Sequence, residues 1–209
     1  MALKKNKVKF GLNKVHWAKI TGWSDEGIPT FAKPVRLPGA VSLAIDANGE
    51  NENFYADNGV YYVINNNSGY EGDLEVALIT TEFAIEILGE VLDSKGVLVE
   101  SNDAETSQFA LLFEFDGDKN HIRHVLYCCS ASRPATEGQT TEESKEVKTE
   151  TLSLKATALP SGLVKSKTCE STDEATYNGW YNAVYIPTMP AKTSSISARS
   201  TSTKTAAAD

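Results

Sequence analysis

The chain has 209 residues, 41% of them hydrophobic, and a formal net charge of -8. This length favours a single domain, and the apolar content is ordinary for a protein with a buried core. No stretch approaches the ~20 apolar residues of a membrane helix. The start of the chain lacks the apolar run of a secretory signal, and the three cysteines do not form a disulfide framework. We therefore expect a protein made in the cytoplasm, with no membrane segment.

Charge is unevenly distributed along the chain. Residues 1–20 contain six lysines and no acid, while residues 21–186 hold 27 acidic and 11 basic residues. We interpret residues 1–20 as a basic N-terminal arm, which includes Lys4, Lys5, Lys7 and Lys9. Such an arm is either a solvated tail, a patch for nucleic acid, or a segment that docks on the acidic body of a neighbouring copy. Charge complementarity favours docking over nucleic acid.

Alternation of apolar and polar residues is common in this chain, and helical periodicity is scarce. Residues 15–21 are predicted to form a strand, residues 22–29 a hairpin turn, and residues 30–37 a returning arm that Pro34 and Pro38 restrict. Residues 41–46 form the next expected strand, which ends at the turn signal Asn48–Gly49. The first 50 or so residues are therefore predicted to form β-strands and turns.

Residues 50–68 are polar and rich in asparagine, and they are predicted to form a long hairpin or an extended loop. Four aromatic residues interrupt this polar segment: Phe54, Tyr55, Tyr61 and Tyr62. They belong either to the core or to an interface. Tyrosine is enriched at protein–protein contacts, so we interpret them as inter-subunit anchors.

The segment from Tyr70 to Ile79 alternates with period two, which places Glu71, Asp73 and Glu75 on one face of a strand. The opposite face is mainly apolar. The segment is therefore predicted to bury one side and to present a strip of negative charge on the other. This strip is either an ordinary solvated face or a functional surface.

The remaining elements continue the β pattern. A short helix is expected over residues 82–88, capped by Thr80 or Thr81. The clearest hairpin joins residues 108–115 to 122–131, with Glu114 and Asp116 marking the strand end and its turn. An exposed loop (133–145), two strands (147–158 and 163–169) and a second short helix (173–184) follow. Residues 21–186 thus form one mainly β domain, and residues 187–209 form a Ser/Thr/Ala-rich tail that is expected to be flexible.

Residues with catalytic or metal-binding chemistry form no complete motif. His124 and Cys128 share a strand face, but neither His121 nor Cys129 completes a tetrahedral metal site. Residues 116–120 lack the spaced ligands of a calcium loop, and neither a phosphate loop nor a Gly-x-Ser-x-Gly motif is present. We expect no catalytic residue, no metal and no cofactor.

Taken in order, several segments resemble the major tail protein, or tail tube subunit, of long-tailed non-contractile bacteriophages. They are spread over about residues 6–186. The segments are NKVKFGL (6–12), PGAVSL (38–43), FYADN (54–58), GYEGDLE (69–75), LLFEFDGD (111–118), RHVLY (123–127), TETL (149–152) and GLVK (162–165).

This resemblance implies a small β-sandwich or half-barrel flanked by a short helix. It implies hexameric rings that stack into a hollow tube, the conduit for DNA ejection. Tape measure and tail terminator proteins would be partners, and double-stranded DNA would pass without specific binding. The protein would then belong to the virion tail, after assembly in the host cytoplasm. Glu71, Asp73 and Glu75 become candidates for the wall of the bore, where carboxylates repel phosphates.

Two other functions stay open on the sequence. One is the tube of a phage-derived particle that carries no DNA, whose subunit would look alike. The other is a cytoplasmic ligand-binding β-barrel, which predicts a monomer with an apolar pocket.

Overall fold

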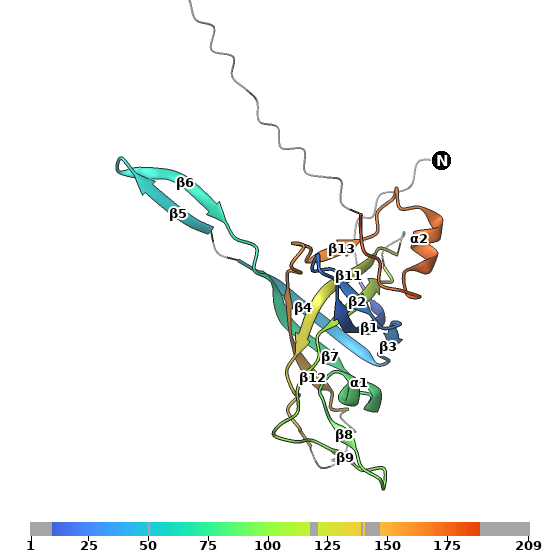
Figure 1. Cartoon of the computed structure of the whole chain (residues 1–209). Coiled ribbons are helices and arrows are strands. Elements are labelled where there is room, and N and C mark those ends of the chain that lie inside the picture. Colours follow the sequence, from blue (N-terminus) through green and yellow to red (C-terminus); the bar gives the residue numbers. More distant parts are fainter. Residues whose placement is uncertain (1–9, 50, 118–120, 139, 141–146, 189–209) are drawn as a thin grey trace, which may run out of the picture.

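The computed structural model describes residues 10–49, 51–117, 121–138, 140 and 147–188. Within these residues the protein is mainly β, with one large antiparallel sheet and two short helices (Figure 1). The expected mainly β class is therefore confirmed. Residues 1–9, with Lys4, Lys5, Lys7 and Lys9, lie outside the described part, as do residues 189–209 of the C-terminal tail.

The large sheet contains nine strands. Its main path runs β2 (Pro29–Phe31), β1 (Leu12–Trp23), β10 (Phe109–Phe115), β11 (Arg123–Ala131), β12 (Glu150–Thr157), β7 (Gly69–Val76) and β4 (Ala40–Asn48). Two short strands lie off this path: β3 (Val35–Arg36) pairs with β1, and β13 (Lys165–Lys167) pairs with β11. Two separate hairpins complete the β structure of the described residues, β5 (Asn51–Ala56) with β6 (Gly59–Asn65) and β8 (Val91–Leu92) with β9 (Leu98–Val99).

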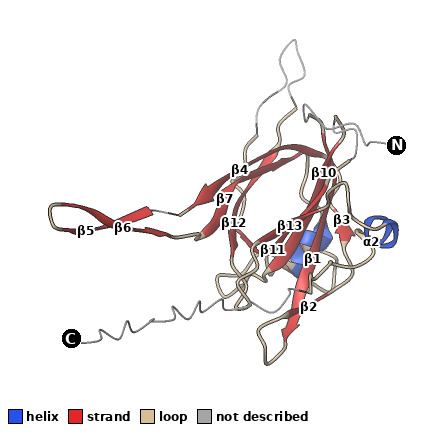
Figure 2. Cartoon of the chain, turned by 90° about the horizontal axis from the view of Figure 1, so that it is seen from above, coloured by secondary structure: helices blue, strands red, loops and turns tan. Residues whose placement is uncertain are grey.

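The large sheet curves so that its two halves face each other (Figure 2). Apolar side chains of β7 and β12, such as Leu74 and Leu152, share one core cluster with Trp17 of β1 and with Phe109 and Leu111 of β10. Each of these side chains is at most 3% exposed. The alternation read in the sequence therefore directs one apolar face of each half into a common interior.

Helix α1 (Thr81–Glu86) packs into this interior. Thr80 caps it by accepting a hydrogen bond from the backbone N–H of Phe83, as one of the two sequence interpretations expects. The ring of Phe83 makes edge-on contacts with Trp17 at 5.6 Å and with Phe109 at 5.5 Å, measured between ring centroids. The buried aromatic contacts fix the helix against the two central strands.

A second core covers the other face of β10 and β11. Leu112, Val125 and Tyr127 are fully buried there beneath Trp180, which follows α2 (Glu174–Gly179). The sequence predicted one buried face for β10, but six of its seven residues are buried, because the segment after α2 covers the second face. Helix α2 is also shorter than the predicted residues 173–184.

The part of the predicted N-terminal arm that the structure describes lies mostly in the sheet. Residues 12–20 belong to β1, which pairs with β10 along most of its length. Alternation buries Val15 and Trp17, so this segment joins the sheet although Lys14 and Lys19 flank the two buried residues. Lys14 and Lys19 form ion pairs with Glu114 and Glu86 instead of extending from the body.

The Asn-rich segment forms a hairpin that extends away from the body (Figure 1). Asp57 and Asn58 have φ angles of 51° and 62° at its tip. Positive φ at both central residues is the mark of a type I′ turn, whose twist suits two antiparallel strands. The hairpin alternative is therefore the one that this segment adopts.

Candidate interaction surfaces

The acidic strip lies on β7, between β4 and β12. In the two ladders Glu71 is opposite Asp46 and Lys155, Asp73 is opposite Ala44 and Ser153, and Glu75 is opposite Ser42 and Thr151. Leu74 and Val76, which alternate with the acids, are buried. The predicted division of β7 into an apolar inner face and an acidic outer face is therefore present in the structure.

Neutral donors hold each of the three carboxylates. Asn48 Nδ2 donates to Glu71 at 2.9 Å and Ser153 Oγ donates to Asp73 at 2.8 Å. Glu75 accepts from Thr149 Oγ1 at 2.5 Å and from Ser42 Oγ at 2.8 Å. The two hydroxyl hydrogen bonds, first that of Thr149 and then that of Ser42, hold the pKa of the Glu75 carboxyl below its usual range.

A polar depression of about 530 Å³ extends this surface across β12 to the end of β11. Its lining includes Glu71, Asp73, Ser130, Ser153 and Lys155. Six of its ten described lining residues carry a hydroxyl or a carboxylate, and Lys155 is the one cation among them. The outer face of this half of the sheet is thus hydrophilic and rich in acidic and hydroxyl groups.

The four aromatic residues of the β5–β6 hairpin are all exposed. Phe54, Tyr55, Tyr61 and Tyr62 are between 57% and 72% exposed, so none of them belongs to the core of the single chain. Phe54 lies opposite Tyr62 in the hairpin ladder and makes an edge-on contact with Tyr61, with ring centroids 6.5 Å apart. The rings of Phe54 and Tyr61 contact each other but remain largely exposed to solvent.

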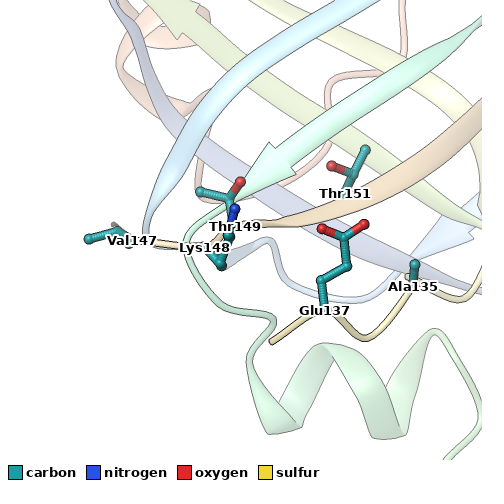
Figure 3. Close-up of a pocket in the computed structure, with 6 residues that line it drawn as sticks. All are labelled: Ala135, Glu137, Val147, Lys148, Thr149 and Thr151. Carbon is teal, nitrogen blue, oxygen red and sulfur yellow. The ribbon is translucent and has the colours of Figure 1, made fainter. Parts of the chain in front are cut away.

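A further depression of about 350 Å³ lies beside the N-terminal end of β12 (Figure 3). Glu137 points toward β12, whereas Val147 points away from it (Figure 3). Its charged lining residues, among those described, are Glu137 and Lys148. The lining that the structure describes contains no histidine or cysteine, and the arrangement does not resemble a nucleophile with its base.

The buried carboxylate of Glu114 was not anticipated from the sequence. Glu114 is 1% exposed and lies 2.8 Å from Lys14 Nζ and 3.2 Å from Arg123 Nε. Tyr181 donates its hydroxyl to the same carboxylate at 3.1 Å. Burial, and then the charge of Glu114, raise the pKa of the Tyr181 hydroxyl.

Arg123 connects this carboxylate to α2. Its guanidinium lies 3.9 Å from the ring centroid of Tyr177 and also donates to the Tyr177 backbone carbonyl. A carboxylate between Phe113 and Phe115 near the end of the apolar strand β10 was the available signal, because a buried carboxylate requires a partner.

The histidines and cysteines considered as metal or thiol sites have structural roles. The His124 ring stacks on Phe113 with centroids 5.0 Å apart, and Cys128 and Cys129 are buried. Glu114, Asp116 and His121 bring one potential ligand atom each within 4.8 Å of one another. Protein donors already hold both carboxylates, since Asp116 accepts from Asn13 Nδ2 at 3.0 Å. We therefore interpret this cluster as an ion-pair and hydrogen-bond network.

No protein-family model and no curated protein sequence matches this chain. In the described part of the chain, neither helix has the length and apolar character that crossing a membrane requires.

Proposed function

We propose that the protein is a structural, self-assembling subunit of a bacteriophage tail tube, without enzymatic activity. The observation that carries this proposal is the β5–β6 hairpin. It exposes six large apolar side chains, Phe54, Tyr55, Val60, Tyr61, Tyr62 and Val63, on one arm outside the core. Soluble monomers rarely expose such a cluster unless it binds a partner. The resemblance of segments between residues 6 and 186 to tail tube subunits favours a second copy as that partner.

Open sheet edges support the same proposal. Strand β4 ends the main path of the large sheet and hydrogen bonds to β7 on one side. Exposed edges invite pairing with another chain. Head-to-tail pairing that closes on itself gives a ring, and six copies would form the hexameric ring that the resemblance implies. Tape measure and tail terminator proteins are proposed as further partners on the resemblance alone.

The acidic face then becomes the wall of the bore. Six copies of Glu71, Asp73 and Glu75 supply on the order of 18 carboxylates, which repel DNA phosphates. Salt screens such a field within about 10 Å at 0.1 M, so the repulsion acts at the close range of a narrow channel. Neutral donors hold the carboxylates without neutralising them. Double-stranded DNA would therefore pass without specific binding. The tube of a DNA-free particle would carry the same features.

A ligand-binding β-barrel is less well supported. The depression lined by Leu43, Ile45, Phe113, Phe115 and His124, with Tyr70 and Lys165, has about 190 Å³. Pockets for small molecules usually measure ~300–1,000 Å³. This space is small for a ligand, and the barrel function offers no role for the exposed hairpin.

Size-exclusion chromatography and negative-stain electron microscopy of the purified chain test the proposal. Hollow tubes with a regular axial repeat are expected as concentration rises. A chain that stays monomeric at every concentration would overturn it.

A paired variant tests the role of the hairpin. Replacing Tyr55 and Tyr61 by serine removes exposed apolar area, so the monomer should keep its fold while tube formation is lost. The control Asn53→Ser changes an exposed polar residue of the same hairpin and should leave tubes intact. Normal tubes from the Tyr55→Ser/Tyr61→Ser chain would contradict the anchor role.

A further inference from the structure

A second group of exposed aliphatic side chains lies far from the first. Val91, Leu92, Val97 and Val99 of the β8–β9 region are each between 45% and 61% exposed. We call these four residues the β8–β9 patch. Outside the β5–β6 hairpin and this patch, the large exposed apolar residues that the structure describes lie singly in other segments: Phe10, Trp23, Val41, Leu78, Val147 and Tyr185. Two concentrations of exposed apolar surface therefore stand out.

These two surfaces lie at opposite ends of the same strands. Strand β4 ends and β7 begins at the β5–β6 hairpin, whereas β7 ends toward Leu78 and α1, next to the β8–β9 hairpin. Figure 1 shows β8 and β9 at the lower end of the body, beyond α1, and β5 and β6 extending from the opposite end of β4 and β7. A subunit with one apolar surface at each end is built for head-to-tail contact, and such a contact repeats without limit unless it closes.

We propose that the β8–β9 patch receives the β5–β6 hairpin of a second copy of this chain. This inference rests on the proposed function, which requires contacts between successive subunits, and it names the surface that accepts the hairpin. Aromatic rings from one end would cover aliphatic side chains at the other, which removes both from water.

Charge at the two tips agrees with this pairing. The β8–β9 turn presents Lys95, while the exposed Asp93 carboxylate accepts from the backbone N–H groups of Lys95 and Val97 at 2.8 and 2.7 Å. The tip of the β5–β6 hairpin carries Asp57, which is exposed. Opposite charges at a contact steer and align the partners.

The acidic face is a poor alternative receiver. An aromatic hairpin laid over Glu71, Asp73 and Glu75 would take carboxylates from water without offering them a cation, and burying unpaired charge is costly. Residues 91–99 contain one carboxylate, Asp93, which already accepts from two backbone N–H groups of its own turn. Apolar composition therefore favours the patch over the acidic face.

Crosslinking tests the contact directly. Val60→Cys on the hairpin and Val97→Cys on the patch are combined in a Cys169→Ser chain, because Cys169 is the exposed native thiol while Cys128 and Cys129 are buried. A short flexible bis-maleimide is then added to assembled protein. The control pairs Val60→Cys with Ser42→Cys, an exposed residue beside the acidic strip.

The expected result is a ladder of covalent dimers, trimers and longer chains from the Val60/Val97 pair. The Val60/Ser42 pair and each single-cysteine chain should give no ladder. Well-formed tubes whose Val60/Val97 cysteines do not crosslink would overturn the receiver and leave the proposed function standing. A dimer from Val60→Cys alone would show hairpin-to-hairpin contact and would also overturn it. A parent chain that never assembles would instead overturn the proposed function.

A charge substitution gives an independent measurement. Val97→Asp places a carboxylate in the patch and should raise the concentration needed for assembly at least tenfold, with an unchanged melting temperature of the monomer. Ser94→Asp adds the same charge to the same hairpin without removing apolar surface, so its shift should be much smaller. Equal shifts for the two variants would overturn the apolar contact.

Discussion

The ion pair at Glu114 offers the sharpest test of what holds α2 against the sheet. Glu114→Gln keeps the shape of the side chain and removes its charge, so no cavity is created. The amide oxygen can still accept from both Arg123 and Tyr181, because both donate to the same oxygen of Glu114. The guanidinium of Arg123, whose side chain is 12% exposed, then loses its counter-charge.

The burial of the two partners sets the size of the effect. Removing one partner of a buried ion pair costs about 3–5 kcal/mol. Lys14 is 45% exposed, so its share is that of a surface pair, about 0.5 kcal/mol. The loss of the Arg123 partner therefore accounts for most of the expected destabilisation. We expect a loss of about 3 kcal/mol in the free energy of unfolding, which for a chain of this size lowers the melting temperature by about 6–12 °C.

Urea unfolding of the monomer, followed by circular dichroism, measures this loss. Hydrogen exchange over residues 174–186 adds a local readout, because α2 should open before the sheet unfolds. Glu100→Gln is the matched control: Glu100 pairs with Arg133, and both side chains are about half exposed. That change should cost less than about 1 kcal/mol. Equal losses for Glu114→Gln and Glu100→Gln would refute the idea that the buried ion pair of Glu114 and Arg123 holds α2 against the sheet.

Three further outcomes are expected. Thr149→Val removes the stronger of the two hydroxyl hydrogen bonds to Glu75, so the pKa of that carboxyl should rise toward its usual value, as NMR titration would measure. Because the pKa of Glu75 is lower in the folded state, its ionisation stabilises the fold above the unfolded pKa. This stabilisation is lost as pH falls through the folded pKa. The Thr149→Val variant should therefore lose less stability on acidification than the parent chain. Gly72→Ala should destabilise the monomer by about 2 kcal/mol or more in urea, since φ is +153° and a Cβ would lie 2.0 Å from a β4 carbonyl oxygen; a neutral outcome would contradict this packing. Replacing Glu71, Asp73 and Glu75 by lysine should still allow tubes but slow DNA ejection, measured in particles that carry the variant; unchanged ejection would count against an acidic bore.

The strands were largely predictable from the sequence because alternation reports which side chains share a face. The acidic face of β7, the hairpin between β10 and β11, and the Thr80 cap all follow from local patterns. Residues 50–68 left two alternatives, hairpin or loop. The Asp57–Asn58 pair at the tip is the local signal that favours the hairpin, since these residue types tolerate positive φ.

The second core and the Glu114 network were not predictable in the same way. Alternation in β10 assigns Leu112 and Glu114 to the face opposite Phe113, but it does not say what covers that face. The cover comes from Trp180 and Tyr181, which are distant in sequence. Contacts between distant segments depend on sheet order, and a single sequence does not determine that order. Glu114 was therefore interpreted as the end of a strand.

The layered arrangement also determines where an added domain would sit. Tyr127 donates its hydroxyl to the Tyr185 carbonyl at 3.0 Å, which ties the chain after α2 to the outer side of β11. That side is remote from the β7 carboxylates, because the main core lies between them. In the proposed tube, with the β7 carboxylates lining the bore, a reporter or binding domain fused beyond residue 188 would start from the outer wall. It would then decorate the outside and leave the passage clear.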